Sequence, residues 1–92
     1  MKITKEELLA KLNKDLAWEY AALIQYVQHA SVITGAEYES FIAELLVHAN
    51  EEMQHATNLC EQIDFLGGVP AVDVQTIKTS SDSTEMLEQD LE

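Results

Sequence analysis

The sequence is poor in cysteine and in basic residues, and each scarcity narrows what the protein can be. Its one cysteine, Cys60, cannot form a disulfide within the chain, and small chains without disulfides are typical of the cytoplasm rather than of secretion. Five Lys and Arg residues stand against 17 Asp and Glu residues, and a net charge of -12 argues against nucleic-acid binding. No apolar run approaches the roughly 20 residues of a membrane span. We therefore expect a cytoplasmic protein with neither nucleic acid nor membrane as partner.

Glycine and proline are also rare, and their positions divide the chain into helices. The 92 residues, 47% of them apolar, fit one small globular domain over residues 1–92. Apolar residues recur at helical spacing from about Lys5 to Val32, with Thr4 and Glu7 as a capping box. A second helix is expected from about Glu37 to Leu66. Gly35 separates the two helices, and the fold class is therefore all-α.

The end of the second helix is marked by Gly67-Gly68 and Pro70, which cannot continue it. Residues 69–82 are then expected to form a crossover loop. Asp82 and Glu85 repeat the capping pattern, which predicts that residues 82–92 form the first turns of a third helix. The short connection at Gly35 predicts an antiparallel two-helix hairpin. A lone hairpin buries little surface, so we expect two chains to form a homodimer, or a higher homo-oligomer, as a four-helix bundle.

Ionisable residues occupy the middle of both expected core stripes. In the first helix Glu19 interrupts the stripe Leu9, Leu12, Leu16, Glu19, Leu23, Tyr26, Ala30. In the second helix the stripe runs Leu45, His48, Glu52, His55, Leu59, Gln62, Leu66. A buried carboxylate is very costly unless it is paired, neutralised or bound to metal, and two that meet repel each other. A divalent cation held by Glu19, Glu52 and His55 would resolve both problems, and carboxylates with one imidazole suit iron or manganese.

Several segments resemble the bacterioferritins of the ferritin-like di-iron superfamily over nearly the whole chain. The similar segments are Leu12–Glu19, Gln25–Ala30, Asn50–Ala56, the exit Ile63–Pro70, and Glu85–Leu91. The resemblance implies that Glu19 is a terminal carboxylate ligand, Glu52 a bridging carboxylate and His55 a terminal imidazole, with Tyr26 close to the metals. It also implies uptake of Fe(II) and its oxidation by dioxygen or peroxide at a di-iron centre, for iron storage or detoxification.

The chain departs from the family because the third-helix Glu and the fourth-helix Glu-x-x-His are missing. It is therefore either a piece of a longer protein or a two-helix half-ferritin, and in the second case two chains would supply the complete set of ligands. Met53 occupies the position of the haem-ligating methionine of bacterioferritins, but methionine also fills gaps at helix interfaces, so haem is the less favoured reading.

Some alternatives stay open at the level of sequence. His48 is either an additional ligand or an ordinary, partly buried histidine, and Tyr26 is either packing or part of the site. The same ligands also serve manganese catalase, rubrerythrin-like peroxidases and di-iron oxygenases. A non-enzymatic hairpin that dimerises and binds metal only adventitiously is the third hypothesis.

Overall fold

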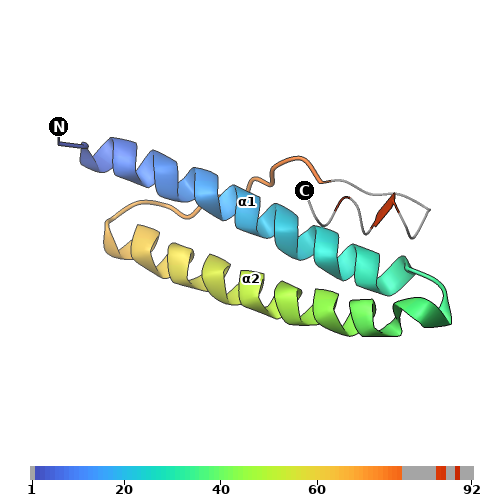
Figure 1. The fold of residues 1–92 in the computed structure, drawn as a ribbon. Helices are drawn as coiled ribbons and strands as arrows, with labels where there is room; N and C mark the ends of the chain where they lie inside the picture. Colours follow the sequence, from blue (N-terminus) through green and yellow to red (C-terminus); the bar gives the residue numbers. More distant parts are fainter. Residues whose placement is uncertain (1, 78–84, 87–88, 90–92) are drawn as a thin grey trace.

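Two long antiparallel helices make up most of the protein (Figure 1). The structure is a computed structural model that describes residues 2–77, 85, 86 and 89. Helix α1 spans Lys5–Val32 and helix α2 spans Glu39–Phe65, with the short 3₁₀ helix η1 at Ala36–Tyr38 between them. No strand occurs among the described residues. The predicted all-α hairpin is confirmed.

The helix ends follow from local sequence. The Glu7 backbone N–H donates to Thr4 Oγ1 over 3.1 Å, so Thr4 caps α1 as predicted. Gly35 has φ of 112°, a conformation that side-chain-bearing residues rarely adopt, and it turns the chain back. The second helix was expected from about Glu37, but η1 occupies this start and regular α-helix begins at Glu39.

The exit from α2 is a Schellman motif built on two glycines. Gly67 has φ of 82°, its N–H donates to Asp64 O over 2.9 Å, and the Gly68 N–H donates to Ile63 O over 2.9 Å. These two bonds satisfy carbonyls that the last turn of a helix leaves unpaired. The predicted stop at Gly67-Gly68 is therefore confirmed.

The hairpin is held together by a core at the end where α2 finishes. Leu16 and Ile63 are fully buried against Ala56, and each such aliphatic side chain contributes roughly 1.5–3 kcal/mol by leaving water. Partly buried side chains pack around these three: Leu9, Leu12, Tyr20, Leu59, Cys60 and Ala71. This core lies beside the region of Glu19 and His55, so it fixes the spacing of the helices there.

The buried stripe of α2 differs from the predicted one. Its buried residues are Leu45, Ala49, Ala56 and Ile63, whereas His48, His55 and Gln62, expected in the seam, are exposed. Both stripes have helical spacing, but the small alanines allow α1 to approach closely without burying imidazole or amide groups. Within the single hairpin, the three predicted seam positions are therefore exposed, and the alanine stripe faces α1 instead.

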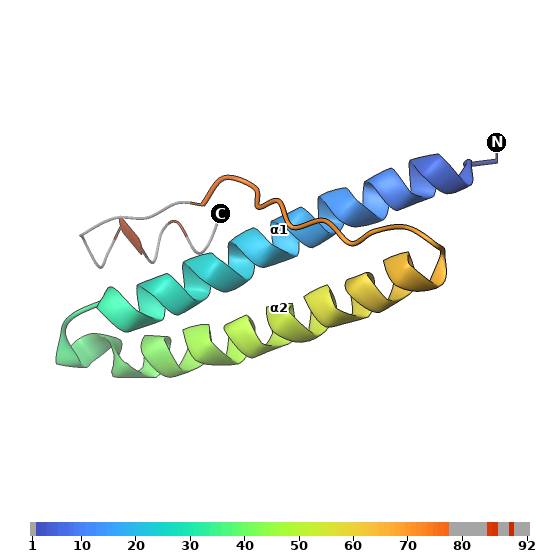
Figure 2. The same cartoon turned by 180° about the vertical axis from the view of Figure 1, so that it is seen from behind.

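The crossover lies along α1, as both views of the fold show (Figures 1 and 2). Asn13 holds it on both sides of Pro70: Asn13 Nδ2 donates to Val69 O over 3.2 Å, and the Ala71 N–H donates to Asn13 Oδ1 over 2.7 Å. Farther along, the Gln75 N–H donates to Ala17 O over 3.3 Å. Residues 69–77 have no regular secondary structure, and residues 78–82 of the expected crossover lie outside the described residues.

Three described residues follow the crossover. Glu85, Met86 and Gln89 have helical backbone, Met86 is buried, and Gln25 Nε2 donates to Gln89 O over 3.4 Å. The rest of the expected third-helix start, including Asp82, Leu87 and Leu91, lies outside the described residues. Among the described helices, none combines the length and apolar character needed to cross a membrane.

Candidate metal centre

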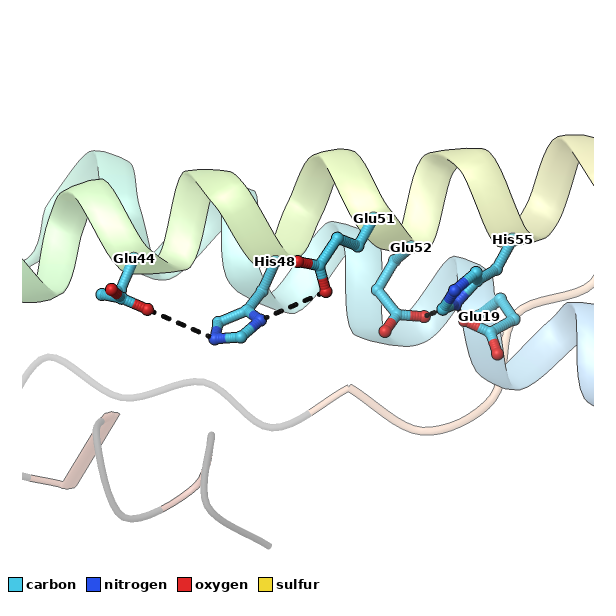
Figure 3. Close-up of polar contacts among 6 residues, drawn as sticks. All are labelled: Glu19, Glu44, His48, Glu51, Glu52 and His55. Atoms are coloured by element: carbon cyan, nitrogen blue, oxygen red, sulfur yellow. Dashed lines mark ion pairs between the residues drawn. The ribbon is translucent and has the colours of Figure 1, made fainter.

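Glu19, Glu52 and His55 converge where α1 and α2 face each other. Glu19 is near the middle of α1, and Glu52 and His55 lie one turn apart on α2, so the antiparallel pairing brings them level. His55 Nδ1 is 3.6 Å from Glu19 Oε2 and 3.7 Å from Glu52 Oε2. One ligand atom from each residue lies within 4.8 Å of the other two. Figure 3 shows the three side chains close together on one side of the hairpin.

The spacing of these atoms suits a shared cation better than direct hydrogen bonds. A separation of 3.6–3.7 Å between nitrogen and oxygen is too long for a hydrogen bond. Two ligands that each sit about 2.1 Å from one metal are at most about 4.2 Å apart, so both separations fit joint coordination. His55 turns Nδ1 toward both carboxylates, so Nδ1 is the nitrogen placed to bind.

The site has an unbalanced negative charge. The Glu19 and Glu52 side chains are 27% and 21% exposed, so both are partly buried. Glu19 Oε2 is buried and accepts no hydrogen bond within the described part of the chain. A neutral His55 would leave two negative charges at the site, and a protonated His55 would offset the charge of only one carboxylate. A buried, unpaired oxygen beside a second carboxylate and an imidazole is what a divalent metal would satisfy, so these residues fit the predicted metal.

One side of the site is open. The His55 side chain is 56% exposed. A hollow of about 360 Å³ adjoins it, lined by Asp15, Trp18, Glu19, His55, Asn58 and Leu59. Asp15 and Asn58 were not among the residues predicted from the sequence. Asp15 stands four residues before Glu19 and Asn58 three residues after His55, and these spacings place each pair on one helix face.

His48 belongs to a separate group on α2. Its Nε2 is 3.7 Å from Glu44 Oε2 and its Nδ1 is 3.7 Å from Glu51 Oε2, all on exposed side chains (Figure 3). Within the described part of the chain, Glu19, Glu52 and His55 form the one group of three close enough to hold a metal. The structure thus brings His48 to Glu44 and Glu51, not to the three predicted ligands.

The other predicted site residues have different surroundings. The Tyr26 ring lies against the His48 ring, with centroids 5.9 Å apart. Met53 is 53% exposed on α2, where a partner could reach it. Cys60 is a free, partly buried thiol that is hydrogen-bonded with the Tyr20 hydroxyl over 3.5 Å. This bond and, next, burial raise the pKa of Tyr20 above its ordinary value.

Known proteins with similar sequences and structures share this arrangement of helices. The ferritin-like domain family matches residues 9–92. A bacterioferritin from Desulfovibrio desulfuricans is 35% identical over 66 residues, which cover 72% of this chain and 37% of the bacterioferritin. This chain therefore spans well under half the length of that relative.

Two solved structures superpose on nearly the whole chain. A ferritin-like, diiron-carboxylate protein from Bacillus anthracis str. Ames matches with a TM-score of 0.88 and 34% identity, covering 98% of this chain and 65% of that protein. A dodecameric thioferritin, the bacterioferritin-related protein of Bacteroides fragilis, matches with a TM-score of 0.84 and 31% identity, covering 98% of this chain and 60% of that protein.

Proposed function

This chain belongs to the ferritin-like domain family, and from that membership we propose that it binds iron at a carboxylate-bridged di-iron site and oxidises Fe(II) to Fe(III). The observation that carries the proposal is the convergence of Glu19, Glu52 and His55, with Glu19 Oε2 buried and unpaired. The similar Bacillus anthracis protein is described as a diiron-carboxylate protein, which supports iron as the metal. Manganese, which prefers the same oxygen and imidazole ligands, is the alternative metal.

Each of the three residues has a distinct task in this proposal. Glu19 would hold one metal from α1, His55 would hold it from α2 through Nδ1, and Glu52 is the carboxylate that would be shared with a second metal. Because the carboxylates arise from two rigid helices packed on a common core, their positions are set before metal arrives. A bound pair of ferrous ions would supply two electrons, one from each ion, to reduce dioxygen to peroxide. Tyr26, two turns from Glu19 along α1, is proposed as a tyrosine near the metals.

A complete site needs ligands beyond those of a single hairpin. Two chains related by a twofold axis would together offer four carboxylates and two histidines, the ligand set of ferritin-like bundles. The exposed side of His55 and the half-exposed Trp18 beside it leave room for a second hairpin. If the natural protein is longer, its later helices would supply the same ligands within one chain. We place the protein in the cytoplasm, where its lone cysteine stays reduced.

Other chemistries have weaker support. A di-iron oxygenase needs an apolar substrate pocket beside the metals, whereas the hollow there has only Trp18 and Leu59 as apolar lining residues. Manganese catalase and rubrerythrin-like peroxidase use the same ligands, so the metal and the oxidant separate them from a ferroxidase. Haem binding through Met53 stays a prediction of the family resemblance.

The decisive experiment is anaerobic Fe(II) titration of the purified protein followed by exposure to air. We expect two Fe(II) bound per pair of chains and oxidation faster than in buffer. Glu52→Ala should reduce the rate to that of buffer. Glu61→Ala, which removes an exposed carboxylate elsewhere on α2, should leave the rate unchanged. Equal rates for the wild type and Glu52→Ala would remove the proposed function, and binding without oxidation would leave a metal-binding protein that is not a ferroxidase.

A further inference from the structure

The far edge of the His55 ring needs a hydrogen-bond acceptor if Nδ1 binds metal. Coordination through Nδ1 requires the proton to be on Nε2, and metal-bound histidines almost always donate this second N–H to a carboxylate, a carbonyl or a water. His55 turns Nδ1 toward Glu19 and Glu52, at 3.6 and 3.7 Å, so Nε2 is on the edge of the ring away from both. The side chain is 56% exposed, so this edge is not enclosed by α1 and α2.

The hollow beside His55 has two side chains, besides the ligands, that contain a hydrogen-bond acceptor, Asp15 and Asn58. Asn58 Oδ1 already accepts from Gln54 Nε2 over 3.1 Å. The Asp15 carboxylate has no hydrogen bond or ion pair with any residue that the structure describes. Asp15 is therefore the charged acceptor of this hollow, and both of its oxygens are unused by the described residues, whereas Asn58 Oδ1 already accepts one hydrogen bond.

The topology of the hairpin places Asp15 at the correct height. Asp15 lies four residues before Glu19 on α1, and His55 lies three residues after Glu52 on α2. Because the helices are antiparallel, both steps lead in the same direction from the level of the two glutamates. Asp15 and His55 thus lie at the same height and line the same hollow from opposite helices.

We propose that Asp15 is a positioning residue for the metal site, whose carboxylate accepts the Nε2–H of His55 directly or through one water. The inference rests on the proposed function, because it assumes that Nδ1 of His55 binds metal. A carboxylate in this place fixes the imidazole tautomer with Nδ1 deprotonated, limits rotation of a half-exposed ring and makes Nδ1 a stronger donor. A hollow of about 360 Å³ is large enough for a bridging water of about 30 Å³.

The test compares Asp15→Ala with Asp15→Asn in the full chain, and Glu61→Ala is the control for loss of one surface charge. The readout is the Co(II) dissociation constant, measured anaerobically by competition with a coloured chelator. We expect Asp15→Ala to weaken Co(II) binding about 10- to 100-fold, the usual effect of removing such a partner. Asp15→Asn, which keeps a neutral acceptor, should fall between Asp15→Ala and wild type. Glu61→Ala should stay within about twofold of wild type.

A second readout follows the proton itself. In the Zn(II)-loaded wild type, NMR should detect the His55 Nε2–H in slow exchange with water, and Asp15→Ala should lose this signal while its circular dichroism is unchanged. Equal Co(II) affinities for Asp15→Ala and Glu61→Ala would overturn the role of Asp15. If Glu52→Ala abolishes Co(II) binding at the same time, the metal site itself stands. If Glu52→Ala binds Co(II) like the wild type, the proposed function and this inference fall together.

Discussion

Leu9 occupies the space that a side chain at position 68 would need. A Cβ atom added to Gly68 would lie 2.7 Å from Leu9 Cδ2 and 3.1 Å from Leu9 Cδ1, closer than non-bonded carbon atoms approach. The end of α2 therefore touches the first turns of α1 through bare backbone. Position 68 is therefore a point where the end of α2 contacts the start of α1, as well as part of a helix cap.

Gly68→Ala should destabilise the protein by about 1 kcal/mol, because the added methyl group must push aside the tip of the partly buried Leu9 side chain, which can change rotamer. Denaturant unfolding followed by circular dichroism measures the loss. The double variant Leu9→Ala/Gly68→Ala should be less destabilised than the sum of its single variants, since the smaller side chain makes room. Strict additivity would show that the two positions are not in contact.

Asn13→Ala should loosen the attachment of the crossover to α1. The change removes the donor to Val69 O and the acceptor of the Ala71 N–H, and leaves the backbone groups to find water. We expect a loss of roughly 1–2 kcal/mol in unfolding free energy, and faster proteolysis within residues 69–77. Asn50→Ala, an exposed asparagine of α2, is the matched control and should change neither quantity. Identical cleavage rates for the two variants would show that Asn13 does not hold the crossover.

Glu19→Gln should separate the effects of charge and metal at the site. Without metal, the variant should be more stable than wild type by about 1 kcal/mol, because repulsion between Glu19 and Glu52 is removed. With saturating Zn(II), the wild type should gain thermal stability through binding and the variant should gain much less. Melting curves with and without Zn(II) provide both comparisons. A variant that gains as much from Zn(II) as the wild type would exclude Glu19 as a ligand.

Trp18 should report metal binding through its fluorescence. It is the single tryptophan of the chain and lines the hollow shared with Glu19 and His55, so bound Co(II) would quench it at close range. Quenching should saturate with the stoichiometry of the site and disappear in Glu52→Ala. His48→Ala should quench like the wild type, because His48 lies with Glu44 and Glu51. Lost quenching in His48→Ala alone would instead place the metal at that second group.

Cys60→Ala should lower the pKa of Tyr20 toward its ordinary value near 10. The hydrogen bond with Cys60 is the largest cause of the raised pKa and burial is the next, so some elevation should persist. A raised pKa in the folded state stabilises the protein below the pKa of an unfolded tyrosine. This contribution is lost as pH rises through the pKa of the folded protein. Titration of the phenolate absorbance, with Tyr20→Phe to identify the residue, tests this, and unchanged curves in Cys60→Ala would contradict it.

Features encoded by neighbouring residues could be predicted from the sequence. The cap at Thr4 and the stop at Gly67-Gly68 depend on residues within one turn, so both helix limits there were correct. The meeting of Glu19 with Glu52 and His55 required only an antiparallel hairpin with a short connection. These contacts follow from helical periodicity and chain length, which the sequence displays directly.

Features that depend on how the helices rotate against each other could not be predicted. Two stripes of α2 have the same spacing, and the choice of Ala49 and Ala56 over His48 and His55 for the seam is made by packing with α1. The hydrogen bonds of Asn13 with Val69 and Ala71 join positions more than fifty residues apart, so no local sequence pattern predicts them. The proximity of Asp15 to His55 likewise depends on the packing of the two helices, because the two residues line one hollow from different helices.

The open edge of His55 should also affect how fast a metal ion enters and leaves the site. A cation in a single hairpin can exchange ligands with water and chelators through that edge, so it should enter and leave quickly however well the three donors fit it. Covering the edge with another helix would slow both arrival and departure, because each would then require the bundle to open. Residence time would thus be set by association of the hairpins, and dilution should shorten it.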